Sequence, residues 1–199
     1  MVEIDNILDV TKHLEGIDVV IFDLDDTLYS EKEYVRSGYR QIATIIPGIT
    51  EEELWTAFQN NEPAIDVILE RHGLLNRKAE ALRAYRFHIP DIHLYEGVRE
   101  MLRGLDKFGI ITDGRPEGQR AKLAVLGLNC ETIITDELGG IEFRKPNETA
   151  FRIMQERMNV PYERMAYVGD NKGKDFVAPE NLGMRCIYFK NPDSLYKEL

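Results

Sequence analysis

The chain has 199 residues, which is enough for one α/β domain with a smaller insertion but short for two full domains. Hydrophobic residues make up 43% and charged residues 30%, and no apolar run approaches the ~20 residues of a membrane span, so the composition predicts a globular protein. The formal net charge of −10 argues against a nucleic-acid backbone as partner, and any phosphate ligand would need cations gathered locally.

The amino-terminal stretch, residues 1–15, is acidic and lacks the basic start and apolar stretch of a secretion signal. Cytoplasmic residence is therefore expected. Cys130 and Cys186 lie far apart in apolar surroundings, which is typical of reduced core residues. The four histidines lack the spacing typical of a zinc site.

The first strand signal is the apolar run at residues 19–22, which ends abruptly at Asp23. Such a continuous run is typical of a strand buried on both faces of a sheet. After it, residues 30–90 carry helix signals but no convincing strand. We expect helices at residues 31–46, 51–60, 65–72 and 77–87, separated by Pro and Gly. The pattern predicts a helical insertion at 30–90 within a core made of residues 1–29 and 91–199. The alternative is that these helices pack elsewhere on the sheet.

Four further strands are expected, at residues 108–111, 132–135, 165–168 and 186–189. Between them, Pro116 is typical of a first helical position and Gly127 of a helix stop, and another helix is expected at residues 149–158. Alternating strands and helices predict a parallel sheet covered on both faces, an α/β fold. Ligands bind such sheets at the carboxyl ends of the strands, where Asp23, Thr112 and Asp170 stand.

Two carboxylates at the tip of the first strand, Asp23 and Asp25, would repel each other unless a cation or a proton intervened. This tension favours a division of labour in which Asp23 stays ionised as a nucleophile and Asp25 carries a proton for a departing alkoxide. Attack by Asp23 on phosphorus would give an aspartyl phosphate that water hydrolyses, with Asp25 activating the water. The alternative is that these acids form a helix cap or an acidic turn.

Two more motifs supply a metal site and a phosphate site. Asp170 and Asp175 offer hard oxygen ligands that suit Mg²⁺, although Gly-Asp-Asn can also be an ordinary turn. Lys145 can bring a fixed positive charge to Asp23 and to phosphoryl oxygens, although a lysine before a helix is often only solvated. Thr112 can donate a hydroxyl to the phosphate. Gly114 lets neighbouring N–H groups approach it.

In this order and at these strand ends, the motifs resemble those of the haloacid dehalogenase-like hydrolase superfamily over residues 18–189. The four matching segments are residues 23–28, 111–114, 145–146 and 169–170 with Asp175. The resemblance implies a Rossmann-like core with a helical cap inserted after the first motif. Because the dehalogenase branch lacks an acid at the position of Asp25, phosphate chemistry is favoured over carbon–halogen chemistry.

The same resemblance implies roles for individual residues. Asp23 would be nucleophile and metal ligand, and Asp25 general acid and base with its backbone carbonyl on Mg²⁺. The remaining implied roles are phosphate binding for Thr112, Asp113 and Lys145, metal binding for Asp170, and support for Asp175, Gly114 and Asn171.

The expected function is therefore Mg²⁺-dependent hydrolysis of a small phosphate monoester, such as a sugar phosphate or a nucleotide. A phosphomutase of the same superfamily would use the same aspartyl phosphate, and a non-catalytic regulatory module could keep the fold. A receiver domain also uses an acid cluster, a Thr and a Lys. The long insertion and the second acidic motif of this chain fit that class of protein poorly. Candidate substrate contacts are Tyr34, Tyr39, Arg40 and Arg115, while the oligomeric state has no signal in the sequence.

Overall fold

The computed structural model describes residues 1–195 and divides into two compact units. The core unit comprises residues 1–31 and the chain from His93 onward. The helical unit comprises residues 32–92. Each unit is described below by itself.

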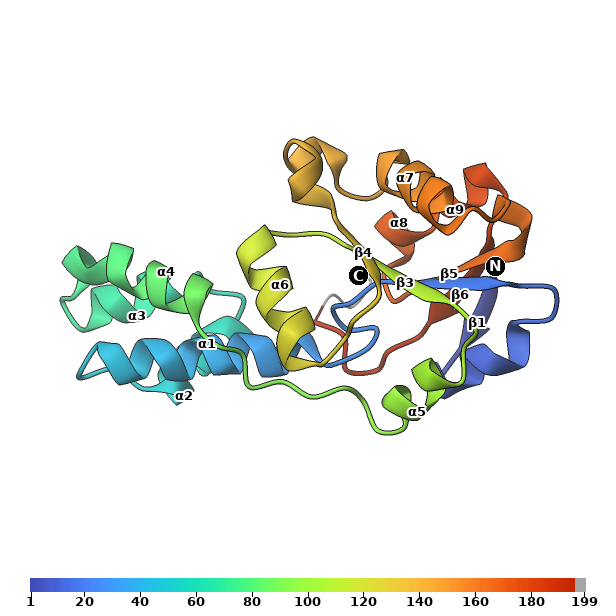
Figure 1. Ribbon diagram of the computed structural model, residues 1–199. Helices are drawn as coiled ribbons and strands as arrows, with labels where there is room; N and C mark the ends of the chain where they lie inside the picture. Colours follow the sequence, from blue (N-terminus) through green and yellow to red (C-terminus); the bar gives the residue numbers. More distant parts are fainter. Residues whose placement is uncertain (196–199) are drawn as a thin grey trace. The chain divides into compact units, whose positions relative to one another are not determined.

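A six-stranded parallel sheet forms the centre of the core unit, in the order β1-β6-β5-β2-β3-β4 (Figure 1). Its strands are β1 (Val2–Ile4), β2 (Val19–Phe22), β3 (Phe108–Thr112), β4 (Glu131–Ile134), β5 (Met165–Gly169) and β6 (Arg185–Phe189). The α/β fold class and the five expected strands are confirmed. Strand β1 was not expected, because it has three residues with a charged one in the middle and a single buried one, Ile4.

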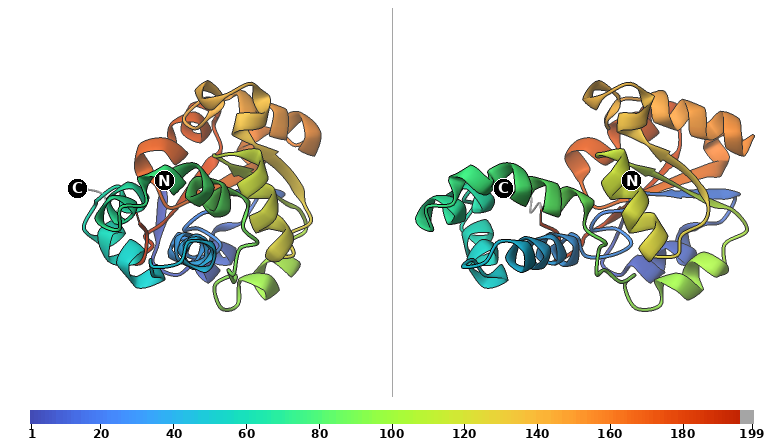
Figure 2. Two further views of the ribbon diagram at one scale, coloured as in Figure 1. Left: turned by 90° about the vertical axis from the view of Figure 1, so that its left-hand side faces the viewer. Right: turned by 60° about the vertical axis from the view of Figure 1, so that its left-hand side comes forward.

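Helices cover both faces of this sheet, with α7, α8 and α9 on one face and α5 with the 3₁₀ helix Ile7–His13 on the other (Figures 1 and 2). The α-helices are α5 (Val98–Arg103), α6 (Pro116–Val125), α7 (Thr149–Met158), α8 (Lys172–Asp175) and α9 (Val177–Leu182). Further 3₁₀ helices are Thr135–Leu138, Ile141–Phe143 and Tyr162–Arg164. Pro116 starts α6, as expected, because its fixed φ suits the first helical position.

Every residue of β2 and β5 is buried, which explains why these strands are continuous apolar runs. One face of the sheet packs against α7 through Ile21 of β2, Ile133 of β4 and Tyr167 of β5, with Phe151 and Met154 on the helix. Burial of large side chains contributes roughly 1.5–3 kcal/mol each relative to exposure. The two central strands are therefore firmly held, and their carboxyl ends form a rigid platform.

The helical unit contains four α-helices and one short 3₁₀ helix. They are α1 (Glu31–Ile45), α2 (Glu51–Gln59), α3 (Ala64–Arg71), the 3₁₀ helix Leu75–Arg77 and α4 (Lys78–Phe87). Thr50 and Glu53 cap the start of α2 reciprocally, each side chain bonding to the other's backbone N–H. Helices α1 and α4 approach closely at Gly38, where an added Cβ would lie 2.5 Å from the Tyr85 ring. The four expected helices agree with the structure to within one residue at either end.

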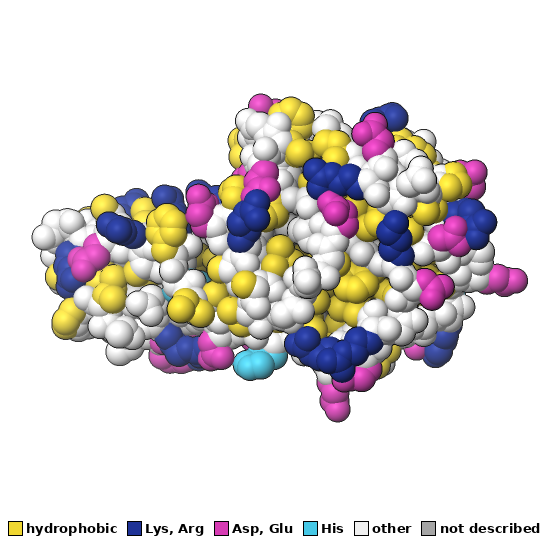
Figure 3. Space-filling model, in the orientation of Figure 1, with side chains coloured by type: hydrophobic (Ala, Val, Ile, Leu, Met, Phe, Trp, Pro, Cys, Tyr) yellow, Lys and Arg dark blue, Asp and Glu magenta, His cyan; other side chains and the backbone are white. Residues whose placement is uncertain are grey.

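Acidic and basic side chains lie next to one another over the face shown in Figure 3. Arg120 on α6 forms an ion pair with Glu137, with 2.7 Å between nitrogen and oxygen. Among the described residues, 1–195, no helix is both long and apolar enough to cross a membrane. Cys130 and Cys186 are both free thiols, the second buried in β6 and the first half-buried.

Candidate active site

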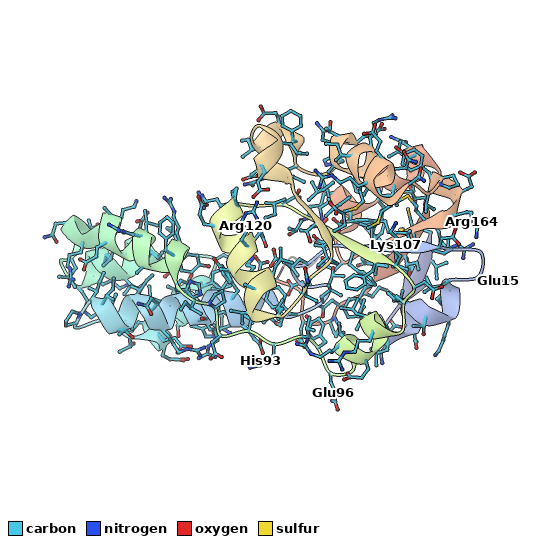
Figure 4. The ribbon with its side chains drawn as sticks, in the orientation of Figure 1. Glu15, His93, Glu96, Lys107, Arg120 and Arg164 are labelled. Atoms are coloured by element: carbon cyan, nitrogen blue, oxygen red, sulfur yellow. The ribbon has the colours of Figure 1, made fainter. Side chains whose placement is uncertain are left out.

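The carboxyl ends of β2, β3 and β5 bring together residues that are far apart in the sequence. Strand β2 lies between β3 and β5, and the Asp23 N–H donates to the Val168 carbonyl at 2.8 Å. Asp113 follows β3 and Asp170 follows β5, so both lie at the same edge of the sheet as Asp23. Arg164, labelled in Figure 4, precedes β5 and marks the opposite, amino-terminal edge.

Lys145 joins two of the acids. Its Nζ lies 2.7 Å from Asp23 Oδ1 and 2.8 Å from Asp175 Oδ1, and it donates to the Tyr167 hydroxyl at 2.9 Å. The Lys145 side chain is fully buried, as is that of Asp175, while Asp23 is almost so. The lysine is therefore a fixed cation between Asp23 and Asp175, and the structure brings these three predicted residues together.

Burial and charge shift the pKa values of this cluster. Burial favours the neutral form of Lys145, but the Asp175 and Asp23 carboxylates outweigh it and hold the lysine pKa well above its usual value. Burial raises the pKa of Asp23 to about 6, although Lys145 opposes the rise. Burial, reinforced by Asp23 and Asp175, raises the pKa of Asp170 to about 8. The protein alone thus leaves negative charge at Asp23 and Asp170 incompletely balanced.

A group of carboxylates suited to a cation is formed by Asp23, Asp170 and Asp175, each offering one oxygen within 4.8 Å of the others. Asp170 also accepts a hydrogen bond from Ser194 Oγ at 2.9 Å. Asp175 Oδ2 accepts one from the Asn171 N–H at 3.0 Å, and the supporting role of Asn171 stays a prediction. Oxygen donors and unbalanced negative charge fit a small divalent cation such as Mg²⁺.

The segment after β3 is tied to the Lys145 loop through Asp113. Asp113 Oδ1 accepts hydrogen bonds from the Lys145 N–H at 3.1 Å and from Thr135 Oγ1 at 2.9 Å. Thr112 is fully buried, and its hydroxyl has no hydrogen-bond partner among the described residues. Thr112 is not among the residues that line the cavity described below, so phosphate binding by its hydroxyl stays a prediction.

The Asp25 carboxylate does not belong to the group formed by Asp23, Asp170 and Asp175. Its carboxylate accepts hydrogen bonds from Lys122 Nζ at 2.7 Å, from Gln119 Nε2 at 3.0 Å and from the Tyr29 hydroxyl. Burial alone raises the Asp25 pKa, but Lys122 and the other two donors outweigh burial and lower it below its usual value. The free protein therefore holds Asp25 as a carboxylate. The sequence had led us to expect the proton on this acid.

A cavity of about 580 Å³ lies in the core unit. Its acidic lining residues are Asp23, Asp25, Asp26, Glu31, Asp113 and Asp170, and its basic ones are Arg115, Lys122, Arg144, Lys145 and Lys174. Gly114 also lines it with a φ of +131°, and a Cβ there would lie 2.7 Å from the Gln119 amide nitrogen. The cavity therefore suits a small, strongly polar ligand.

Two of the four expected substrate contacts have packing or pairing roles within the helical unit. Tyr39 is buried, and its ring lies 6.2 Å from that of Phe58 and 5.7 Å from that of Tyr85. Arg40 donates to Asp91 at 2.8 Å. The contacts of both side chains are thus made with residues of the helical unit.

The other two expected substrate contacts lie in different units. The Tyr34 ring lies 5.9 Å from that of Tyr85 and 4.9 Å from that of His88, all in the helical unit. Arg115 lines the cavity of the core unit directly. Of the four candidates, Arg115 is the one that the core cavity itself supports.

Sequence reasoning missed Gln119, Lys122, Lys174 and Ser194. The first two lie three residues apart on α6 and are the buried residues of that helix, but polar residues on a helix are usually solvated, so the sequence carried little signal for them. Lys174 and Ser194 carry no comparable local signal.

Comparisons with known proteins identify the family of this chain. The haloacid dehalogenase-like hydrolase family matches residues 20–189. A glyceraldehyde 3-phosphate phosphatase of Methanopyrus kandleri is 31% identical over 199 residues, covering 86% of this chain and 83% of that protein. A protein of the same name from Pyrococcus furiosus is 30% identical, covering 89% and 82%.

Solved structures share the fold. A HAD-superfamily hydrolase of Geobacter sulfurreducens has a TM-score of 0.68 at 20% identity, with 89% of each chain covered. A HAD hydrolase of Bacillus subtilis bound to magnesium has a TM-score of 0.64 at 18% identity, covering 92% of this chain and 90% of that one. With the match over residues 20–189 and the relatives at 30% identity or more, this chain belongs to the haloacid dehalogenase-like hydrolase family.

Proposed function

We propose that this chain is a phosphatase that hydrolyses a small phosphate monoester, with Asp23 as the nucleophile. The observation that carries the proposal is the position of Asp23. It is buried at the carboxyl end of β2, 2.7 Å from the Lys145 ammonium, in a cavity lined by charged groups. A fixed cation beside the attacking carboxylate lowers the repulsion that a phosphate dianion would otherwise meet.

The substrate that we propose is a small sugar phosphate. Relatives that cover most of this chain are named glyceraldehyde 3-phosphate phosphatases, and they supply the substrate class. The cavity of about 580 Å³, with Arg115 and Arg144 among its basic lining residues, supports a compact anionic ligand. A nucleotide was the other candidate class from the sequence, and the relatives favour the sugar phosphate.

We propose Mg²⁺ as the cofactor, held by the side chains of Asp23 and Asp170 and by the backbone carbonyl of Asp25. Asp175 contacts Lys145 and the Asn171 N–H, so we propose that it orients these groups and does not bind the metal directly. Burial and the neighbouring acids raise the pKa of Asp170. This rise supports the binding of a cation that would balance the charge of the carboxylates. When bound, Mg²⁺ would supply Lewis-acid polarisation of the phosphoryl oxygens.

In this proposal the chain's own residues carry out two steps. Asp23 attacks phosphorus while the ester oxygen leaves as an alcohol with a proton from Asp25, and water then cleaves the aspartyl phosphate while Asp25 takes up a proton. Asp25 is a carboxylate in the free protein, and the negative charge of a bound phosphate monoester beside it would raise its proton affinity. Lys145 and the Thr112 hydroxyl would bind phosphoryl oxygens, with Asp113 fixing the Lys145 loop.

The helical unit, residues 32–92, is proposed to act as a cap domain that limits the substrate to small molecules. Its place in the sequence supports this, because it follows directly after the Asp23 motif. Tyr34 is the residue of this unit that we keep as a candidate substrate contact. Cytoplasmic residence stays a prediction from the sequence.

The proposed function is tested by measuring phosphate release from a panel of sugar phosphates and nucleotides with Mg²⁺. We expect the wild-type protein to release phosphate and Asp23→Asn to be slower by at least about a thousandfold while remaining folded, since it lacks the nucleophile. Asp18→Asn is the matched control, because Asp18 is half-buried, pairs with Arg164 and precedes the same strand at its amino-terminal end. Isomer interconversion without phosphate release would favour a phosphomutase, and activity retained in Asp23→Asn would refute the nucleophile.

A further inference from the structure

The carboxylate of Asp25 is held from several sides by side chains of the core unit. Lys122 Nζ donates to Oδ1 at 2.7 Å, and the Tyr29 hydroxyl donates to the same oxygen. Gln119 Nε2 donates to Oδ2 at 3.0 Å. Lys122 and Gln119 lie one turn apart on α6, whereas Tyr29 follows the Asp23 motif, so two separate elements fix one acid.

All three donor residues are buried: Tyr29 is fully inaccessible, and the exposed fractions of Lys122 and Gln119 are 4% and 5%. A lysine is rarely buried without a partner, because removing its charge from water is costly. Asp25 supplies the carboxylate partner in the structure, with 2.7 Å between Nζ and Oδ1. Gln119 is itself anchored, because its amide also donates to the Asp113 carbonyl at 2.8 Å. The donors are therefore fixed before any substrate binds.

We propose that Lys122, Gln119 and Tyr29 are positioning residues that hold the Asp25 carboxylate where it exchanges protons with the leaving oxygen and with water. The inference rests on the proposed phosphatase function. It adds residues that act through Asp25 and belong to none of the motifs of the resemblance. The Asp25 carboxylate is not part of the group suited to a metal, which consists of Asp23, Asp170 and Asp175. We therefore attribute its orientation to the three donors.

The chemistry gives this role a measurable signature. On substrate binding, Asp25 takes up a proton from solvent. In the first step a bond forms between Asp23 Oδ and phosphorus, the ester P–O bond breaks, and this proton passes from Asp25 to the leaving oxygen. An alkoxide needs this proton, whereas 4-nitrophenolate is stable enough to leave without it. Because kcat/KM reports the steps up to and including phosphoryl transfer, a misplaced Asp25 should lower kcat/KM much more for an alkyl phosphate than for an aryl phosphate.

The experiment compares kcat/KM for glycerol 3-phosphate and 4-nitrophenyl phosphate, with Mg²⁺, in the wild type and in Tyr29→Phe, Gln119→Met and Lys122→Met. General acid catalysis contributes about 10²–10⁴-fold, so we expect each variant to lose at least about tenfold more activity on the alkyl than on the aryl ester. Asp25→Asn should give the same pattern, with the largest difference in kcat/KM loss between the two esters. Arg120→Gln is the matched control on α6, because Arg120, labelled in Figure 4, is exposed and forms an ion pair with Glu137.

Each outcome decides one question. Equal losses on both esters would overturn the inference, because a general disturbance of Asp23 or of the metal site slows both substrates alike. Failure of the wild type to release phosphate from either ester would instead overturn the proposed function, and the inference with it. Tyr29→Phe removes a single hydroxyl and keeps the ring, so its result stands even where Lys122→Met fails to fold, which circular dichroism would reveal.

Discussion

Gly169 at the end of β5 leaves room for the carboxylate that anchors Lys145. A Cβ on Gly169 would lie 2.8 Å from Asp175 Cγ, too close for an atom that cannot move away. Asp175 is fully buried and contacts Lys145 at 2.8 Å, so the carboxylate has little freedom to retreat. The absence of one side chain in a strand therefore permits the pairing of Lys145 with Asp23 and Asp175.

We predict that Gly169→Ala displaces Asp175 and lowers kcat by about tenfold to a hundredfold, since an error of about 1 Å at a reacting group can cost that much. Overpacking should also cost roughly 1–3 kcal/mol of unfolding free energy. Phosphate-release kinetics and thermal unfolding measure the two effects. Gly173→Ala is the control, because a Cβ there meets Asn171 Oδ1 at an ordinary 3.4 Å. Full activity in Gly169→Ala would contradict the prediction.

At the scale of elements, the segment after β6 returns to the site. The Leu195 N–H donates to Asp26 Oδ2 at 2.7 Å, and Asn191 Nδ2 donates to the Asp26 carbonyl at 2.6 Å. Ser194, also buried, donates to Asp170 Oδ2 at 2.9 Å. This segment thus holds the loops after β2 and β5 together, and it orients an acid that we propose as a metal ligand.

We predict that Ser194→Ala raises the Kd for Mg²⁺ by about tenfold, because groups that orient a metal ligand typically contribute 10–100-fold to affinity. Isothermal titration calorimetry without substrate measures this directly. Ser37→Ala provides the comparison, because it also removes a buried serine hydroxyl but lies in the helical unit. An unchanged Kd in Ser194→Ala would show that Asp170 needs no support from this segment.

For the whole molecule, the net charge of −10 is a general obstacle to a phosphate substrate. The structure answers it locally, with basic side chains in the same cavity as the acids. On the surface in Figure 3, basic and acidic groups are interspersed. The charges that bear on a phosphate are those inside the cavity, where burial makes them stronger than on the surface.

We predict that Mg²⁺ stabilises the whole protein against heat. A ligand that binds the native state at 100 times its Kd adds about 2.7 kcal/mol, which for a chain of this size corresponds to a rise in Tm of about 5–10 °C. Asp170→Asn should largely abolish the rise, and Asp18→Asn should keep it. Calorimetric scans with and without Mg²⁺ provide the measurement. An equal rise in Asp170→Asn would place the cation elsewhere.

The α/β fold and much of the candidate site could be predicted from the sequence. Strands β2 and β5 were predictable because a strand buried on both faces is a continuous apolar run, which is a local signal. The same holds for α6 and α7, whose starts follow proline signals. Asp23, Thr112 and Asp170 could be grouped in advance because parallel strands end at one edge of the sheet, whereas Lys145 joined them only through its motif.

Only the tertiary structure decided which partners surround each acid. Lys122 is 97 residues from Asp25 and Ser194 is 24 from Asp170, and neither has a motif around it. In the sequence, a buried lysine and a solvated one look the same, because burial depends on where the helix docks. The protonation of Asp25 follows from that docking: its local sequence was compatible with a resting proton, and the donors brought by the fold hold it as a carboxylate instead.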